Sequence, residues 1–202
     1  ANYPNLLVVH PSVPAQSVRE FVAYAKSKAG SLTYASSGTG SVQHLAMELL
    51  RRSAGFEAVH VPYAGSAPAV VDLLGGHVQA SITTLPAALP HAASGRLRVL
   101  GILSQTRVSR LPEVPTLVES GITVIATGWG GIGAPAAVPR QIVMRLNQEI
   151  VRIVNLADVR ERIVTLGGEP RHSSPAEFGR FIGDEMKRWE PVIRESGASM
   201  QN

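Results

Sequence analysis

The 202-residue chain contains no cysteine, which excludes disulfide bonds, thiolate metal sites and cysteine nucleophiles. Aromatic residues make up only 5% of the sequence and do not alternate with arginine or lysine, so no nucleic-acid partner is expected. No apolar run reaches the ~18 residues that a transmembrane helix needs. No signal peptide is visible, so we expect an exported form to have lost its leader or to begin outside this sequence.

The remaining composition is that of a folded, globular chain. Hydrophobic residues make up 45% of the sequence and charged residues 17%, and the formal net charge of +4 is scattered along the chain. At this length folding buries roughly 70% of the surface of the unfolded chain, which is enough for a hydrophobic core without covalent staples.

Short apolar runs alternate with helical patterns over the first half of the chain. The predicted strands cover residues 6–10, 32–35, 57–61, 78–82 and 98–103, and the predicted helices cover residues 17–29, 42–54, 67–74 and 85–94. This alternation predicts a doubly wound α/β sheet with parallel strands. Such sheets bind ligands beyond the carboxyl ends of their strands, so the loops that follow the strands are the candidate sites.

The pattern changes after the fifth predicted strand. Residues 107–138 are rich in proline and glycine and indicate a boundary with a hinge. Beyond them we predict helices over residues 140–156, 157–166 and 175–196. The last of these has a strong start signal, with Ser174 at the N-cap, Pro175 at the first helical position and Glu177 at the third.

The most distinctive loop joins a predicted strand to a predicted helix and reads Ser36, Ser37, Gly38, Thr39, Gly40, Ser41. Its glycines permit a tight turn, and the following helix begins with unpaired N–H groups and a partial positive charge. Together with the hydroxyls, these groups would form a cradle for a carboxylate or a phosphate. In the alternative interpretation a hydroxyl only caps the helix and the glycines only turn the chain.

Two further strand ends carry polar side chains. Tyr63 follows the third predicted strand and would either offer its hydroxyl to a ligand or simply pack, while Ser66 is expected to cap the next helix. Thr83 and Thr84 close the fourth predicted strand, where adjacent hydroxyls suit an oxyanion.

Catalytic and cofactor motifs are missing from the sequence. The loop is not G-x-G-x-x-G and no Gly-Lys-Ser follows it, which weakens the dinucleotide and P-loop interpretations. The six histidines have no metal-ligand spacing, there is no G-x-S-x-G elbow, and Glu48 and Asp72 fall inside predicted helices. An anion cradle without acid–base residues favours binding over turnover, so we expect no enzyme, no cofactor and no metal.

Several segments together resemble the Bug family of solute-binding proteins, the receptors of tripartite tricarboxylate transporters. The segments that carry the resemblance are residues 4–9 (PNLLVV), 32–41 (LTYASSGTGS) followed by HLA at 44–46, 60–63 (HVPY), 72–76 (DLLGG), 111–116 (LPEVPT) and 189–198. The resemblance covers essentially the whole chain, in order.

The resemblance implies a two-lobed, type 2 periplasmic-binding fold with a doubly wound, mostly parallel sheet and a small carboxylate held between the lobes. The ligand would be a dicarboxylate, a tricarboxylate, an amino acid or an aromatic acid, and transporter subunits would be transient partners. Residues 5–125 would form the second lobe, and residues 126–202 would form the hinge crossover and the helical tail of an incomplete first lobe. The implied location is the periplasm.

Family members begin upstream with a segment that has no counterpart in this chain, so the apolar faces of the last helices are expected to lack part of their cover. We therefore expect self-association of this chain. Two other functions stay open: a sensor-input module that shares the fold, and a small α/β transferase that binds phosphate.

Overall fold

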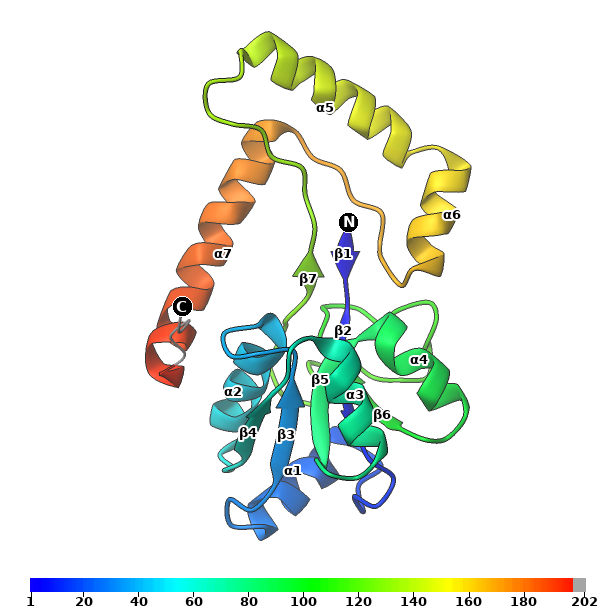
Figure 1. Cartoon of the computed structure of the whole chain (residues 1–202), viewed down its shortest axis with the longest axis vertical. Coiled ribbons are helices and arrows are strands. Elements are labelled where there is room, and N and C mark those ends of the chain that lie inside the picture. The colour runs from blue at the N-terminus through cyan, green and yellow to red at the C-terminus, as the bar shows by residue number, and fades with distance from the viewer. Residues whose placement is uncertain (198–202) are drawn as a thin grey trace. The chain divides into compact units, whose positions relative to one another are not determined.

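The computed structural model describes residues 1–197 and divides them into two compact units (Figure 1). The sheet unit contains residues Pro4–Thr127 together with residues 192–197. The helical unit contains Ala1–Tyr3 and Gly128–Pro191, so the chain passes between the units three times.

The sheet unit is built on a five-stranded sheet in the order β4-β3-β5-β2-β6. Its strands are β2 (Asn5–Val9), β3 (Thr33–Ser36), β4 (Val59–Pro62), β5 (Ala80–Thr84) and β6 (Arg98–Ile102). β3 is parallel to β4 and β5, whereas β2 is antiparallel to both β5 and β6. Four strands therefore run in one direction, and the sheet is mostly parallel with β2 as the exception.

Helices cover both faces of this sheet. They are α1 (Val18–Ser27), α2 (Val42–Ala54), α3 (Ser66–Leu74) and α4 (Leu85–Ala93). On one face Leu6 and Val8 belong to a buried cluster with side chains of α3 and α4. On the other face Leu7 lies opposite Gly101, and a Cβ at Gly101 would collide with Val18 of α1. The sheet is thus doubly wound, as the strand and helix alternation predicted.

Local capping rules account for most of the helix boundaries. The Ser17 hydroxyl accepts a hydrogen bond from the Glu20 N–H at the start of α1, and Ser41 does the same for His44 in α2. The predicted cap at Ser66 is wrong. Gly65 adopts φ +113° with no side-chain cap, so the chain enters α3 one residue earlier and Ser66 is its first helical residue.

The helical unit pairs β1 (Asn2–Tyr3) with β7 (Gly128–Trp129) in a short antiparallel ribbon. Its helices are α5 (Arg140–Val154), α6 (Ala157–Thr165) and most of α7 (Pro175–Ser196). The predicted capping box is confirmed, because Ser174 Oγ accepts the Glu177 N–H while Glu177 accepts the Ser174 N–H.

None of the side chains of α5, α6 and α7 that the structure describes is fully buried. Large apolar side chains that are at least 40% exposed on these helices are Ile142, Met144, Leu146, Ile153, Phe181, Met186 and Ile193. Within residues 1–197, no helix has both the length and the hydropathy for a membrane span.

Candidate functional site

Residues 36–41, here named the anion loop, connect the carboxyl end of β3 to the amino end of α2. Gly38 has φ +131° and Gly40 has φ +77°, a region in which other residues are strained. Both glycines are therefore needed for the path of the backbone. The loop delivers the chain to the N-terminus of a 13-residue helix, where the partial positive charge of the helix dipole is located.

The loop is held by its own polar groups. Buried Ser36 accepts the Gly38 N–H at 3.2 Å, and its hydroxyl lies 2.7 Å from His60 Nε2. The Gly40 N–H donates to His44 Nδ1 at 3.1 Å. Ser37 donates to Gln43 Oε1 at 2.8 Å, and the Ser41 hydroxyl caps α2. These groups give the loop its shape in the unliganded chain.

A second set of donors in and after the loop has no such partner. Within residues 1–197, the backbone N–H groups of Thr39, Val42 and Gln43 have no hydrogen-bond acceptor. Thr39 is also exposed, and its hydroxyl has no partner in the described part of the chain. These groups at the positive end of α2 are free to bind an anion.

The carboxyl end of β5 contributes a buried hydroxyl. Thr83 is 1% exposed, and its Oγ1 is the one buried side-chain polar atom among residues 1–197 without a hydrogen-bond partner. Buried hydroxyls in native proteins nearly always have a partner, so an unpaired one points to a water or ligand atom that completes it. Thr84 is half-buried and immediately precedes α4.

Asn5 is a residue at this edge of the sheet that sequence reasoning missed. Because β2 is antiparallel, its first residue lies at the carboxyl edge of the other strands, opposite Thr84. The buried Asn5 amide accepts from Gln43 Nε2 at 3.4 Å and donates to the Ala126 carbonyl at 2.7 Å. An asparagine at the head of an apolar strand was the available signal.

Tyr63 is committed to an internal hydrogen bond. Its hydroxyl donates to Asp72 Oδ2 of α3 at 2.6 Å, and its N–H donates to the Ser36 carbonyl at 3.1 Å. Partial burial and the bond to Asp72 raise the pKa of Tyr63 to about 12. The proton of this hydroxyl is therefore already used, although the oxygen keeps a free lone pair.

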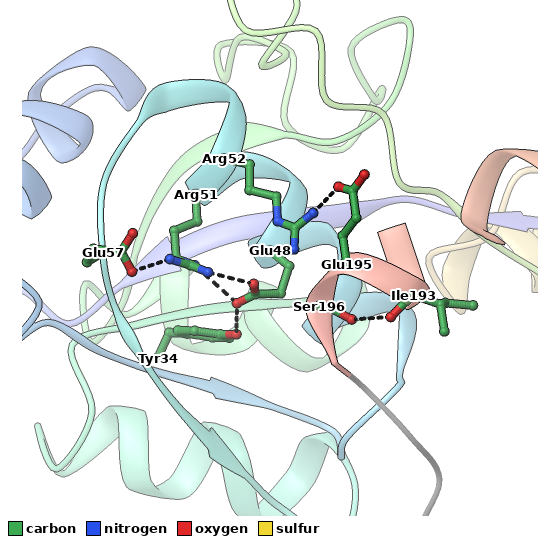
Figure 2. A network of polar contacts seen from close by, with 8 residues as sticks. All are labelled: Tyr34, Glu48, Arg51, Arg52, Glu57, Ile193, Glu195 and Ser196. Carbon is green, nitrogen blue, oxygen red and sulfur yellow. Dashed lines mark hydrogen bonds and ion pairs between the residues drawn. The ribbon is translucent and has the colours of Figure 1, made fainter. Parts of the chain in front are cut away.

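A column of polar side chains underlies the anion loop. The rings of His44 and His60 stack at 3.9 Å, and Tyr34 stacks on His60 at 5.0 Å. The Tyr34 hydroxyl donates to Glu48 at 2.8 Å, and Arg51 pairs with the same carboxylate at 3.0 Å (Figure 2). Burial lowers the pKa of His44, and burial together with the charge of His44 lowers the pKa of His60 to about 4.

Within the described residues, no cluster of three or more histidine, aspartate or glutamate side chains could hold a metal ion. A shallow hollow that includes Ala25, Gly30 and Phe56 lies at the opposite edge of the sheet, where α1 and α2 end. None of the residues that line it belongs to the anion loop.

The sequence profile described as "Tripartite tricarboxylate transporter family receptor" matches residues 1–198. The chain belongs to this family. Protein BugT of Bordetella pertussis is 38% identical over 98% of the chain and 61% of its own length. The structure of R. palustris Rpa4515 with adipate has a TM-score of 0.89 and 34% identity, covering 98% of this chain and 67% of that one.

MatC from Rhodopseudomonas palustris, solved with bound malate, has a TM-score of 0.83 and 29% identity, covering 95% of this chain and 67% of that one. These similarities confirm the predicted resemblance to the Bug and TctC receptors and the predicted α/β fold of a periplasmic binding protein. The chain spans about 60% of the length of BugT and of a relative from Cupriavidus necator that is 34% identical.

Proposed function

We propose that the chain is part of a periplasmic solute receptor that captures a small carboxylate and delivers it to a tripartite tricarboxylate transporter. The observation that carries this proposal is the set of unpartnered N–H groups of Thr39, Val42 and Gln43 at the positive end of α2. Membership of the receptor family and the relatives solved with adipate and malate support it. No catalytic step is part of the proposal.

The chemistry of these donors suits a carboxylate. Backbone N–H groups cannot be protonated or deprotonated near neutral pH, so they attract a permanent anion without titrating themselves. Hydrogen bonds from N–H groups to an ionised oxygen are shorter and stronger than those between neutral groups. The unpaired hydroxyl of Thr83 and the exposed hydroxyl of Thr39 add donors beyond the backbone.

We further propose that the sheet unit is one lobe of the receptor and that the helical unit belongs to the hinge crossover and the other lobe. The expected division into residues 5–125 and 126–202 differs from these units at the end of α7, because residues 192–197 lie in the sheet unit. In this proposal the nine predicted ligand-binding residues divide into two roles. Thr39, Thr83 and Thr84 would contact the carboxylate or its bridging waters. The other members would hold the shape of the site, and they are Ser36, Ser37, Gly38, Gly40, Ser41 and Tyr63.

The decisive variant removes one N–H group without disturbing the helix. Val42 is the first residue of α2, a position that accepts proline, and Ser41 before it has φ −64° and ψ 156°, which a following proline tolerates. Val42→Pro should weaken adipate or malate binding by about ten- to a hundredfold in calorimetry, because one charge-assisted hydrogen bond contributes roughly 1.5–3 kcal/mol.

Ala157→Pro is the matched control, since Ala157 is the exposed first residue of α6 and Leu156 before it has φ −64° and ψ 138°. The Ala157→Pro variant should bind adipate or malate as tightly as the parent chain does. The proposal is wrong if neither adipate nor malate nor another small dicarboxylate, tricarboxylate, amino acid or aromatic acid binds, or if a nucleotide or inorganic phosphate binds instead. If Val42→Pro bound these carboxylates as tightly as the parent chain, the N–H groups at the start of α2 would not be the binding site.

Self-association is the second proposal, and it rests on the exposed apolar side chains of α5 and α7. Ile142, Leu146 and Ile153 of α5 are each more than 40% exposed. Full burial of such a side chain contributes roughly 1.5–3 kcal/mol, and these are already about half covered, so a second copy that covers them would gain about 1 kcal/mol from each. Sedimentation at micromolar concentration should show a dimer that Leu146→Glu converts to a monomer. A monomeric parent chain would refute the proposal.

A further inference from the structure

The stacked pair of His44 and His60 lies directly beneath the anion loop and has no role in the proposed contacts with ligand. The two ring planes are 8° from parallel, and each ring contacts one residue of the anion loop. His44 Nδ1 accepts the N–H of Gly40 at 3.1 Å. His60 Nε2 contacts the Ser36 hydroxyl at 2.7 Å, and that hydroxyl accepts the N–H of Gly38.

The hydrogen bond from Gly40 fixes the chemical state of His44. A neutral imidazole has one acceptor nitrogen, whereas a protonated imidazole has two donors and no acceptor. Nδ1 must therefore be unprotonated for this bond to exist, which leaves the hydrogen of neutral His44 on Nε2. Protonation would turn an acceptor into a second donor that faces the Gly40 N–H.

The surroundings of the pair oppose its protonation. The two stacked rings cannot both carry a charge at a separation of 3.9 Å without strong repulsion. His44 is buried, and the neutral hydroxyl-bearing ring of Tyr34 stacks against His60. Among the described residues, Glu48 is the anion that favours a charged imidazole, and its carboxylate is already neutralised by Arg51 and hydrogen-bonded by Tyr34.

We propose that His44 and His60 are positioning residues of the anion loop, and that the loop keeps its binding shape only while His44 is neutral. His60 stacks on His44 and contacts Ser36, whose hydroxyl also donates to the Gly38 carbonyl at 3.1 Å. The proposal rests on the assignment of the anion loop as the carboxylate site. It makes the site insensitive to pH near neutrality and sensitive in acid, where protonation of His44 releases the Gly40 N–H and disorders the donors of the neighbouring residues.

Two replacements of His44 distinguish the effect of its hydrogen-bond acceptor from the effect of its aromatic ring. Asparagine places an amide oxygen near the position of Nδ1, so His44→Asn keeps an acceptor that cannot be protonated. Phenylalanine keeps a flat ring for stacking but has no acceptor, so His44→Phe leaves the Gly40 N–H unpaired. His172→Gln is the control, because His172 is an exposed histidine of the helical unit.

The first measurement uses no ligand. Amide hydrogen exchange at Gly40 should be protected at pH 7 in the parent chain, in His44→Asn and in His172→Gln, and about tenfold less protected in His44→Phe. Nitrogen chemical shifts of the imidazoles should report the Nε2–H form of His44. A protonated His44 at pH 7, or Gly40 protection that is equal in all four proteins, would overturn the proposal.

The second measurement follows adipate affinity from pH 8 to pH 4.5. We expect a loss of roughly tenfold below pH 5.5 in the parent and in His172→Gln, and a smaller loss in His44→Asn. His44→Phe should bind about five- to tenfold more weakly at every pH. A pH profile of His44→Asn that matches the parent would overturn the proposal. If adipate binds none of the proteins, the proposed function fails, while the exchange experiment still decides the role of the histidines.

Discussion

Two adjacent arginines on α2 provide a sharp test of how burial sets the strength of an ion pair (Figure 2). Arg51 pairs with Glu48, whose side chain is 8% exposed, while Arg52 pairs with Glu195, whose side chain is 63% exposed. Glu48 also accepts the Tyr34 hydroxyl at 2.8 Å. Burial opposes the charged form of Glu48, but the hydrogen bonds from Arg51 and Tyr34 outweigh it and lower the pKa of this carboxyl.

Arg51→Leu should destabilise the chain by about 2–3 kcal/mol at pH 7. Removal of one partner from a fully buried pair costs roughly 3–5 kcal/mol, because the remaining charge is left without compensation. The Arg51 side chain is 19% exposed, so water would reach part of the vacated space and reduce the loss. Urea denaturation at pH 7 with an unchanged m-value measures this free energy of unfolding.

Arg52→Leu is the matched control and should cost less than about 1 kcal/mol, since exposed pairs contribute little. Adding Glu48→Gln to Arg51→Leu should recover part of the loss, because a neutral amide needs no counter-charge.

The stability that Glu48 contributes depends on pH with a definite sign. The folded pKa of Glu48 is depressed, so its contribution is complete above its usual pKa of 4.5 and is lost as the pH falls through the lower folded value. The deficit of Arg51→Leu should therefore shrink below about pH 4.5, and equal losses in the two arginine variants would refute the reasoning.

Four further outcomes follow from the structure. Gly101→Ala should cost about 1–3 kcal/mol, because its Cβ would lie within 2.8 Å of Val18 and Leu117 side-chain atoms; an unchanged melting temperature would contradict this. Ser174→Ala should cost about 1 kcal/mol through loss of the capping box, and thermal denaturation would show it. Because the folded pKa of His60 is depressed to about 4, the unfolded chain binds the proton first, so stability should fall as the pH drops from about 6.5 toward 4. Carboxylate binding should be unaffected by EDTA and nearly flat between about pH 6 and 8, and calorimetry with a fully ionised ligand checks both.

The helices could be predicted closely because their limits depend on neighbouring residues. The predicted helix over residues 42–54 coincides with α2, and the last helix begins at Pro175 as its capping box indicated. The exact limits of the strands shifted by one or two residues, since a strand ends where its partner ends. The antiparallel direction of β2 had no local signal, because direction depends on where the preceding chain enters the sheet.

The sequence predicts the proposed site at the level of the loop, and the fold decides which donors of that loop remain without a partner. Residue type alone marks every glycine N–H and every serine hydroxyl as available, and the fold then assigns most of them to partners. The Gly40 N–H donates to His44, and this bond could have been predicted from the sequence. With Ser41 at the N-cap, a histidine three residues later lies in the first turn of α2 and can reach back toward the loop. The contact of His60 with Ser36 could not be predicted from the sequence, because 24 residues separate the two and only the parallel pairing of β3 with β4 brings them together. The donors that remain for a ligand are those that neither local capping nor strand pairing occupies. They can be identified only when the folded structure shows which donors already have partners.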